Sequence, residues 1–324
     1  MKDVVQGEGL VGLTEIESAS RRLTGVIVPT PLLPADAVSE AVDAQVRLKC
    51  ESLQRAGSFK IRGAFNFVSQ LSDDQVASGI ITYSSGNHAQ AVALAGKLRG
   101  LRVVVVMPTT APKVKRDGAE RLGAEVVYEG TTSLERKERA ERIAEQEGLV
   151  IVPPFDHRHI IAGQGTVGLE IARDWPDVDL VLAPIGGGGL ASGVAAAVKR
   201  MQPSAKVVGV EPEGAASMRK ALDHGAPTLL DRIDTIADGL APIIVGELTF
   251  EHARDLMDDV VTVDDESIRR ATGMLVHRHK LIVEYSGAAT TAALLAGRVK
   301  VKGRRVAAII SGGNLDPDLL TRLP

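Results

Sequence analysis

Lys60 stands in a stretch whose composition could make a lysine chemically reactive. Residues 57–64 read GSFKIRGA, so the apolar side chains of Phe59 and Ile61 flank the amine. Removal from water disfavours the ammonium and leaves a nucleophilic amine, which can form a Schiff base with an aldehyde cofactor. The same stretch also fits an ordinary surface lysine at the start of a helix, so both interpretations stay open here.

A second polar run follows a β-branched segment and precedes an alanine-rich one. It consists of Ser84, Ser85, Gly86, Asn87 and His88. Hydroxyls, an amide and free backbone N–H groups at the start of a helix can bind an anion of the size of a carboxylate. Serine and asparagine are also the commonest helix caps, so the run is equally compatible with capping alone.

Four consecutive glycines, Gly186, Gly187, Gly188 and Gly189, precede Leu190 and another alanine-rich segment. Glycines let successive N–H groups converge on phosphate oxygens in front of a helix. Because such a run is costly in chain entropy, we expect a phosphate site rather than a simple turn. The following residues lack the Gly-Lys-Ser/Thr of a nucleoside triphosphatase loop.

The glycine run also supports a rival interpretation. A strand, a glycine loop, a helix, a strand and then Glu211 are typical of a dinucleotide-binding unit in which the acid binds a ribose hydroxyl. The protein would then be an NAD-dependent oxidoreductase. The glycines are contiguous rather than spaced, however, and this alternative leaves residues 57–64 and 84–88 unexplained.

A fourth motif ends the last apolar run of the chain. It reads Ser311-Gly312-Gly313-Asn314. The hydroxyl could bond to a heterocycle nitrogen, and the motif taken alone also fits a turn.

Two kinds of segment alternate along the chain. Short β-branched runs predict strands over 79–82, 102–107, 125–128, 149–152, 178–182, 206–210 and 305–310. Alanine-rich or amphipathic stretches predict helices over 88–98, 112–122, 134–146, 165–174, 190–200, 265–278 and 286–295. Pro112 is expected in the first turn of its helix and Asp264 as an N-cap. The alternation predicts an α/β fold of parallel sheets with ligands beyond the carboxyl ends of the strands, where the four motifs fall.

Bulk properties narrow the class of protein. The chain has 38 Lys and Arg against 41 Asp and Glu, a net charge of −3, and no basic cluster, so we expect no nucleic-acid partner. Cys50 is the only cysteine, which fits a reducing, cytoplasmic location. The uncharged run 180–198 contains Pro184 and four glycines, so it predicts a strand, a loop and a helix rather than a membrane span.

In this order, the four motifs resemble those of fold-type II enzymes that depend on pyridoxal 5′-phosphate (PLP), particularly the threonine/serine dehydratase (threonine ammonia-lyase) and serine racemase group. Further matching stretches are 161–166 (IAGQGT), 209–215 (GVEPEGA), 236–239 (IADG) and 284–287 (EYSG). The resemblance implies two open, mostly parallel sheets flanked by helices, as in the tryptophan synthase β-subunit, with the active site between two domains. Residues 1–71 and 153–324 would form the large PLP-binding domain and residues 72–152 the small one.

The resemblance also implies roles for individual residues. Lys60 would form the internal aldimine and later take the Cα proton, Asn87 would bond to the phenolic oxygen, and Ser311 would bond to the pyridine nitrogen. Phe59 would flank the ring, and the phosphate would be bound by Gly186, Gly187, Gly188, Gly189 and Leu190. The substrate carboxylate would be received by Ser84, Ser85, Asn87 and the His88 amide, with Arg136 as a helper.

These roles imply elimination of water from L-threonine or L-serine, giving 2-oxobutanoate or pyruvate and ammonia. The Ser311 hydroxyl, unlike a carboxylate, would not hold a charge on the ring nitrogen, which favours loss of a β-hydroxyl over transamination. In the racemase branch, a serine at the position of Ser85 is catalytic and protonates the opposite face of Cα. A serine racemase, a dual enzyme and a 3-hydroxyaspartate dehydratase therefore remain alternatives. The resemblance also implies a homodimer or homotetramer.

Two positions depart from the family pattern. In the racemase-like pattern Glu211, the Ala215 carbonyl and a later acid bind a divalent cation, whereas this chain has Ser217 in place of the acid. Mg²⁺ would then bind more weakly or give way to a monovalent cation. The alternative for Glu211 is a solvated residue after a strand. Tyr285 replaces the common proline after Glu284, near the expected ring site, which predicts altered local contacts and an altered substrate range.

Overall fold

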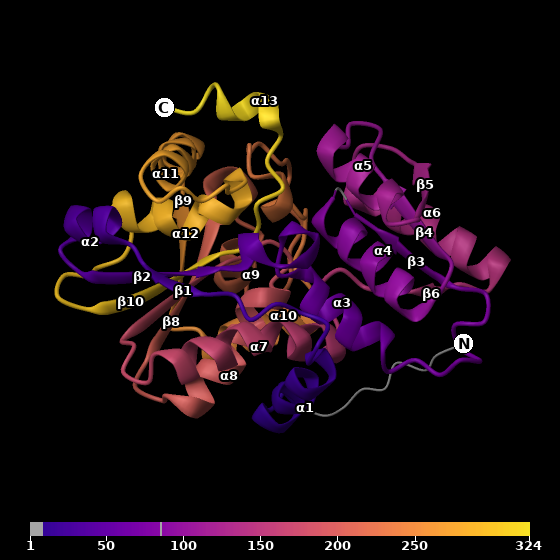
Figure 1. The fold of residues 1–324 in the computed structure, drawn as a ribbon, viewed down its shortest axis with the longest axis horizontal. Coiled ribbons are helices and arrows are strands. Elements are labelled where there is room, and N and C mark those ends of the chain that lie inside the picture. Colours follow the sequence, from indigo (N-terminus) through magenta and orange to yellow (C-terminus); the bar gives the residue numbers. More distant parts are fainter. Residues whose placement is uncertain (1–8, 85) are drawn as a thin grey trace.

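The computed structural model describes residues 9–84 and 86–324, which form two β-sheets (Figure 1). The larger sheet has the order β1-β2-β10-β7-β8-β9, with the strands β1 (Leu32–Pro34), β2 (Gln45–Cys50), β7 (Leu180–Pro184), β8 (Lys206–Pro212), β9 (Asp259–Val263) and β10 (Arg305–Ile310). The smaller sheet has the order β5-β4-β3-β6, with the strands β3 (Ile80–Tyr83), β4 (Val103–Met107), β5 (Glu125–Tyr128) and β6 (Val150–Ile151). Neighbouring strands are parallel, except that β1 is antiparallel to β2.

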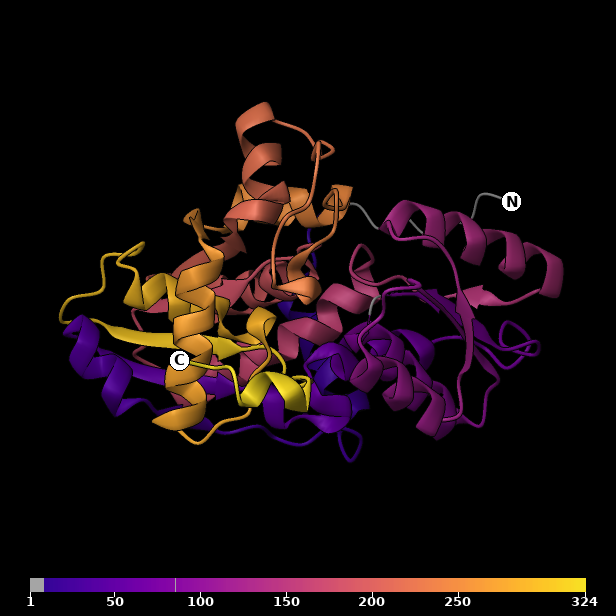
Figure 2. The same cartoon turned by 90° about the horizontal axis from the view of Figure 1, so that it is seen from above.

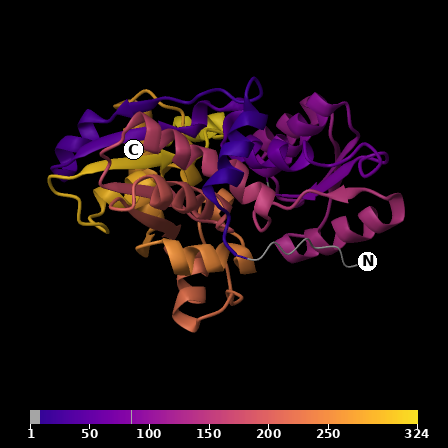
Figure 3. The same ribbon diagram turned by 90° about the horizontal axis from the view of Figure 1, so that it is seen from below.

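Helices separate most of the strands. They are α1 (Leu13–Leu23), α2 (Asp36–Val42), α3 (Lys60–Val68), α4 (Asn87–Arg99), α5 (Lys113–Arg121), α6 (Ser133–Glu147), α7 (Arg158–Asp174), α8 (Gly189–Met201), α9 (Ser217–His224), α10 (Glu247–Leu256), α11 (Asp265–His277), α12 (Tyr285–Leu295) and α13 (Pro317–Leu320). Helices α4, α5 and α6 accompany the smaller sheet at one end of the molecule, and the C-terminal half lies at the other end (Figures 2 and 3). In the part of the chain that the structure describes, no helix is both long and apolar enough to cross a membrane.

Strand β7 shows why helices cover both faces of the larger sheet. Its five residues are all buried. Leu180 and Leu182 belong to a core with α11 and α12, whereas Val181 and Ala183 belong to a core with α7 and α8. Because successive side chains of a strand point to opposite faces, an uncharged run of this kind needs apolar cover on both sides.

All seven predicted strands are present, and their ends differ from the prediction by two residues or fewer. Strands β1, β2 and β9 were missed, as were helices α1, α2, α3, α9, α10 and α13. Asp264 caps α11 as predicted, because its carboxylate accepts a hydrogen bond from the Ser267 amide at 2.8 Å. Pro112 is the N-cap of α5 and thus precedes the first turn in which it was expected.

Helix α7 begins at Arg158 rather than at the predicted residue 165. Glycines lower helix propensity, so Gly163 and Gly165 explain why the predicted helix begins later than the observed one. In the structure they let neighbouring backbones approach. A Cβ at Gly163 would lie 2.5 Å from the Arg62 carbonyl oxygen, and a Cβ at Gly165 would lie 3.0 Å from that of Gly193 on α8. Close packing against α3 and α8 therefore requires glycine at both positions.

Helix α3 lies where the two sheets meet. Its residues Ile61, Ala64, Phe67 and Val68 belong to the same core as α4 and the smaller sheet. The predicted boundary places α3 in the large domain, yet its apolar face packs with the small one. The division of the chain at residues 72 and 152 stays a proposal.

Candidate active site

A cavity of about 370 Å³ opens where the loops after β3, β7 and β10 meet. Its lining includes the predicted site residues Phe59, Lys60, Ser84, Asn87, His88, Arg136, Gly186, Gly187, Gly188, Gly189, Leu190 and Ser311. The structure thus brings together the residues that the sequence proposed for cofactor and substrate. Ser85 lies outside the described residues.

Lys60 is the first residue of α3, and its amine is held without a carboxylate partner among the described residues. Its Nζ donates a hydrogen bond to the Pro154 carbonyl at 3.0 Å and lies 5.3 Å from the centre of the Phe59 ring. The side chain is half-buried because its end faces the cavity. Desolvation by the surrounding protein lowers the pKa of Lys60 from 10.5 to about 8. The neutral, nucleophilic form of the amine is therefore far more populated near neutral pH than it is for a lysine with a pKa of 10.5.

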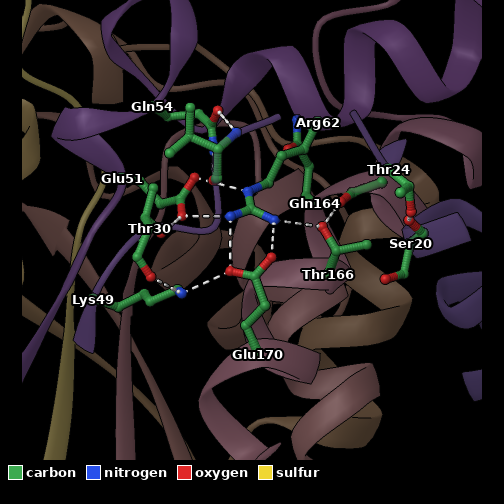
Figure 4. Close-up of polar contacts among 12 residues, drawn as sticks. Ser20, Thr24, Thr30, Lys49, Glu51, Gln54, Arg62, Gln164, Thr166 and Glu170 are labelled. Carbon is green, nitrogen blue, oxygen red and sulfur yellow. Dashed lines mark hydrogen bonds and ion pairs between the residues drawn. The ribbon is translucent and has the colours of Figure 1, made fainter. Parts of the chain in front are cut away.

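Helix α3 is fixed by a buried ion cluster around Arg62, two residues beyond Lys60 (Figure 4). The guanidinium donates to Glu51 through Nε and Nη2, both at 2.8 Å, and to Glu170 through Nη1 at 2.6 Å and Nη2 at 2.9 Å. Lys49 adds a second cation, 2.6 Å from Glu170. Two cations thus balance two carboxylates. This Arg62 cluster ties α3 to the end of β2 and to α7, and so holds the turn that carries Lys60.

The glycine loop joins β7 to the N-terminus of α8. Gly188 has a φ of +96°, a conformation that favours glycine. A Cβ at Gly187 would lie 2.1 Å from the Phe155 ring, and a Cβ at Gly188 would lie 2.7 Å from Thr249. The backbone therefore runs close to its neighbours, and its N–H groups at the start of α8 can receive a phosphate.

A second helix N-terminus, that of α4, also borders the cavity. Ser84 accepts a hydrogen bond from the Gly86 amide at 3.0 Å, and Asn87 is the first residue of α4. The His88 ring points away toward the Val152 carbonyl, 3.2 Å from Nε2, and burial lowers its pKa to about 3. His88 is therefore neutral, and its backbone amide is the group that can contribute to an anion site.

Ser311 lies directly after β10 and faces the cavity. Its backbone oxygen accepts from the Phe59 amide at 3.1 Å, and Ser58 pairs with Gly312 in an isolated bridge. These contacts hold the Lys60 segment against the end of β10. No hydrogen bond of the Ser311 hydroxyl is found within residues 9–84 and 86–324, which leaves it available to a ligand.

Arg136 approaches the cavity from α6. Thr132 and Glu135 form a capping box at the start of this helix. The buried guanidinium donates one hydrogen bond to the Thr131 carbonyl at 3.1 Å, and its Nε has no partner among the described residues. Burial lowers the pKa of Arg136, but the side chain stays cationic. Lys60, Arg136 and two helix N-termini thus make a site for anions.

Comparisons with known proteins agree with this geometry. The sequence model of the family described as "Pyridoxal-phosphate dependent enzyme" matches residues 23–312. The chain belongs to this family of PLP-dependent enzymes. It is 43% identical over 314 residues to an L-threonine ammonia-lyase of Thermotoga maritima, covering 97% of this chain and 78% of the relative. It is 40% identical over 310 residues to a serine racemase of Oryza sativa, covering 94% and 91%.

The fold of this PLP-dependent enzyme also matches a solved structure of maize serine racemase, with a TM-score of 0.93 at 38% identity over 97% of both chains. The predicted fold class, two mostly parallel sheets flanked by helices, is thereby confirmed. The NAD-dependent alternative was wrong. Glu211, which it placed on a ribose, is fully buried and does not line the cavity.

The residues present fit PLP. A lysine amine of lowered pKa faces the cavity, and the glycine loop offers N–H groups at the start of a helix of 13 residues. An aldehyde needs the first group and a phosphate the second.

The predicted cation site has a different arrangement. The carboxylate oxygens of Glu211 accept hydrogen bonds from the Met218 and Arg219 amides, both at 2.8 Å, so that Glu211 caps α9. Ser217 stands 3.4 Å from the same carboxylate, and Ala215 precedes it in a short 3₁₀ turn. Within the described residues no group of three or more His, Cys, Asp or Glu side chains could hold a metal. The cation site at Glu211, Ala215 and Ser217 stays a prediction, whereas the solvated Glu211 of the alternative was wrong, because the residue is fully buried.

Tyr285 is also placed differently from the prediction. Its ring packs in the core of the larger sheet, with the Arg269 guanidinium 5.9 Å from its centre, and it does not line the cavity. The sequence predicted altered contacts at the site of the cofactor ring, because Tyr285 follows Glu284 in the chain. As the first residue of α12, however, it points away from that site.

Sequence reasoning gave no role to four residues of the site. Asp238, Glu284 and Phe155 line the cavity, and Lys115 forms ion pairs with both acids. Stretches 236–239 and 284–287 were recognised, but only as family matches. Lys115 shares a helix face with Gly118 and Ala119, and all three are buried. A lysine on a face of small residues was the signal that could have identified it.

Proposed function

We propose that this enzyme removes water from L-threonine and L-serine, giving 2-oxobutanoate or pyruvate and ammonia. The observation that carries the proposal is the half-buried Lys60 amine, which faces a cavity with two helix N-termini and has no carboxylate partner among the described residues. The Thermotoga maritima relative is named an L-threonine ammonia-lyase, which supports the same reaction.

The cofactor contacts follow from the groups around the cavity. The Lys60 amine would hold PLP covalently, and the N–H groups of Gly186–Leu190 would hold its phosphate. Asn87 would bond to the phenolic oxygen, Ser311 would bond to the ring nitrogen, and Phe59 would flank the ring. When bound, PLP supplies an electron-accepting ring that makes the Cα proton of the substrate acidic.

The substrate would be oriented by its carboxylate. Ser84, Asn87 and the His88 amide at the start of α4 would receive it, together with Ser85, and Arg136, which lines the same cavity, would help. The Lys60 amine, released when the substrate amine takes its place, would accept the Cα proton. Its lowered pKa suits a base that must be neutral before the transfer and protonated after it. The Ser311 hydroxyl would leave the ring nitrogen uncharged, which favours loss of the β-hydroxyl.

Serine racemisation is the second candidate. Ser84 is followed by Ser85, whose hydroxyl could protonate the opposite face of Cα. The relative from Oryza sativa is named a serine racemase. Both activities would use the same Lys60 amine.

We also propose a homodimer or homotetramer in the cytoplasm, acting on an amino acid rather than on nucleic acid or membrane. Cys50 supports a reducing compartment, because burial raises the pKa of its thiol to about 12 and keeps it protonated.

An absorbance spectrum of the purified protein, recorded before and after addition of L-threonine or L-serine, tests the proposal. We expect a visible band of the lysine-bound cofactor and release of 2-oxo acid in the same cuvette. Lys60→Ala should abolish both. A yellow protein that forms D-serine without 2-oxo acid would transfer the assignment to racemisation. A protein that never acquires the band with PLP would refute it.

A further inference from the structure

The side-chain amide of Asn87 has two partners of opposite kind at the edge of the cavity. Its Nδ2 donates to Glu284 Oε1, and its Oδ1 accepts from Nδ2 of Asn314 at 2.9 Å. The same Nδ2 of Asn314 donates to the Ala56 carbonyl at 2.9 Å. Carbonyls and ionised carboxylates only accept hydrogen bonds, so the partners determine the orientation of both amides.

One N–H of Asn87 remains for a ligand. An amide nitrogen carries two hydrogens, and only the bond to Glu284 uses one of them within the described residues. Asn87 lines the cavity, so the second hydrogen is available there. A reversed amide would instead turn Oδ1 toward both the Glu284 carboxylate and any acceptor in the cavity.

A cation on a helix of the smaller sheet favours the ionised form of Glu284, which can only accept hydrogen bonds. Lys115 on α5 lies 2.9 Å from Glu284 and 2.7 Å from Asp238, and both Lys115 and Glu284 are buried. Burial raises the pKa of Glu284, and the Lys115 charge counteracts that rise. Asn87 and Lys115 lie on helices beside the smaller sheet, whereas Glu284, Asp238 and Asn314 lie in segments that connect elements of the larger one. The network therefore also joins the two sheets at the cavity.

We infer that Asn314 and Glu284 are positioning residues that fix the Asn87 amide with an N–H directed at the phenolic oxygen of the cofactor. The inference rests on the proposed function, which puts that oxygen at Asn87. Asn314 and Glu284 act through Asn87, by deciding which of its atoms faces the cofactor. Lys115 contributes by keeping Glu284 in the form that only accepts.

Binding of two cofactor forms tests this inference without measuring turnover. PLP and 3-deoxypyridoxal phosphate, which lacks the phenolic oxygen, are titrated into the full-length enzyme after removal of its cofactor. Wild type should bind PLP roughly 10- to 100-fold more tightly, the range for one hydrogen bond to a charged oxygen. Asn314→Asp places an acceptor against Asn87 Oδ1, so it should weaken PLP binding about tenfold and change binding of the analogue by less than about twofold.

Glu284→Gln gives a second and independent variant. Lys115 requires an oxygen, so the new amide must turn its NH₂ group toward Asn87 Nδ2, and two donors then face each other. The preference for PLP should fall as in Asn314→Asp. Adding Lys115→Met frees the amide to turn, so the double variant should regain part of the preference. Asn66→Asp is the control away from the cavity, because Asn66 on α3 is a more deeply buried asparagine that also donates to a backbone carbonyl, that of His159.

Selective loss of PLP affinity in Asn314→Asp and Glu284→Gln, with recovery in the double variant, supports the inference. Equal losses for both compounds, or losses no larger than in Asn66→Asp, overturn it. Equal binding of both compounds by wild type overturns the contact between Asn87 and the phenolic oxygen. Failure of wild type to bind either compound at Lys60 is a different result, because it refutes the proposed function itself.

Discussion

Replacement of Arg62 by methionine should destabilise the enzyme strongly, because it leaves a buried carboxylate without a cation. Arg62 uses all five of its N–H donors: two reach Glu51, two reach Glu170, and one reaches the Thr166 hydroxyl at 3.0 Å (Figure 4). Without Arg62, Glu170 keeps Lys49 and some contact with water. Glu51 is fully buried, and the Thr30 hydroxyl is then the only side-chain partner left to it among the described residues. The cost therefore arises mainly at Glu51.

Breaking a buried ion pair by removal of one partner costs about 3–5 kcal/mol, or roughly 10²- to 10⁴-fold in the unfolding equilibrium. With a urea dependence of about 3 kcal/mol per M, the unfolding midpoint of Arg62→Met should fall by about 1–1.7 M. The assay is urea unfolding of the holoenzyme followed by circular dichroism. The concentration of PLP is held constant because bound cofactor adds to the apparent stability.

Two further variants separate the explanation from a general loss of packing. Arg102 also binds two carboxylates, Glu125 and Glu147, but on the surface. Arg102→Met should leave the midpoint nearly unchanged, since exposed ion pairs contribute little. The double variant Arg62→Met/Glu51→Gln removes the stranded charge and should recover more than half of the loss. Equal midpoints for the two arginine variants, or a double variant less stable than Arg62→Met alone, would refute the reasoning.

Three other predictions concern the active site and the helix cap. The rate at which PLP reacts with cofactor-free enzyme should rise with pH through about 8, the pKa of Lys60, rather than through 10.5. Gly187→Ala should weaken PLP binding, because the new Cβ would lie 2.1 Å from Phe155, whereas Gly12→Ala, with 3.7 Å of space, should leave binding unchanged. Burial raises the pKa of Glu211 from 4.5 to about 7, so its contribution to stability is largest below pH 4.5 and declines as the pH rises through 7. The difference in melting temperature between wild type and Glu211→Gln should shrink over that range, and a constant difference would contradict the assignment.

The main features of the fold and site could be predicted because each depends on local sequence. A glycine run before an alanine-rich segment marks a loop and a helix wherever the chain places them. The carboxyl ends of parallel strands face one edge, so Ser84 after β3 and Ser311 after β10 could be expected at one cavity. Tertiary packing could not be predicted from local sequence in the same way. The helix predicted over 165–174 begins at Arg158, and the glycines in its first half serve contacts with other helices.

Charged residues were harder to interpret, because burial changes what a charge does. Lys113 and Lys115 stand two residues apart on α5, yet Lys113 is exposed beside Asp117 while Lys115 is buried between Asp238 and Glu284. The partners of Lys115 lie more than a hundred residues away in the chain. Glu211 was interpreted as a metal ligand or a solvated residue, and the sequence did not show that its buried carboxylate also caps α9. Neither the buried ion pairs of Lys115 nor the capping role of Glu211 could be inferred from the adjacent residues in the sequence.

Two buried lysines and the half-buried Lys60 show what distinguishes a reactive amine from a structural one. Lys49 lies against Glu170, and Lys115 against Glu284 and Asp238, so each buried ammonium has a carboxylate that stabilises its charge. Lys60 has only the Pro154 carbonyl among the described residues, and its pKa falls. All three are desolvated, so burial alone does not create a nucleophile. The absence of a counter-ion makes Lys60 nucleophilic. Helix α3 is fixed by the Arg62 cluster, in which two cations balance two carboxylates, and so it needs no carboxylate beside Lys60.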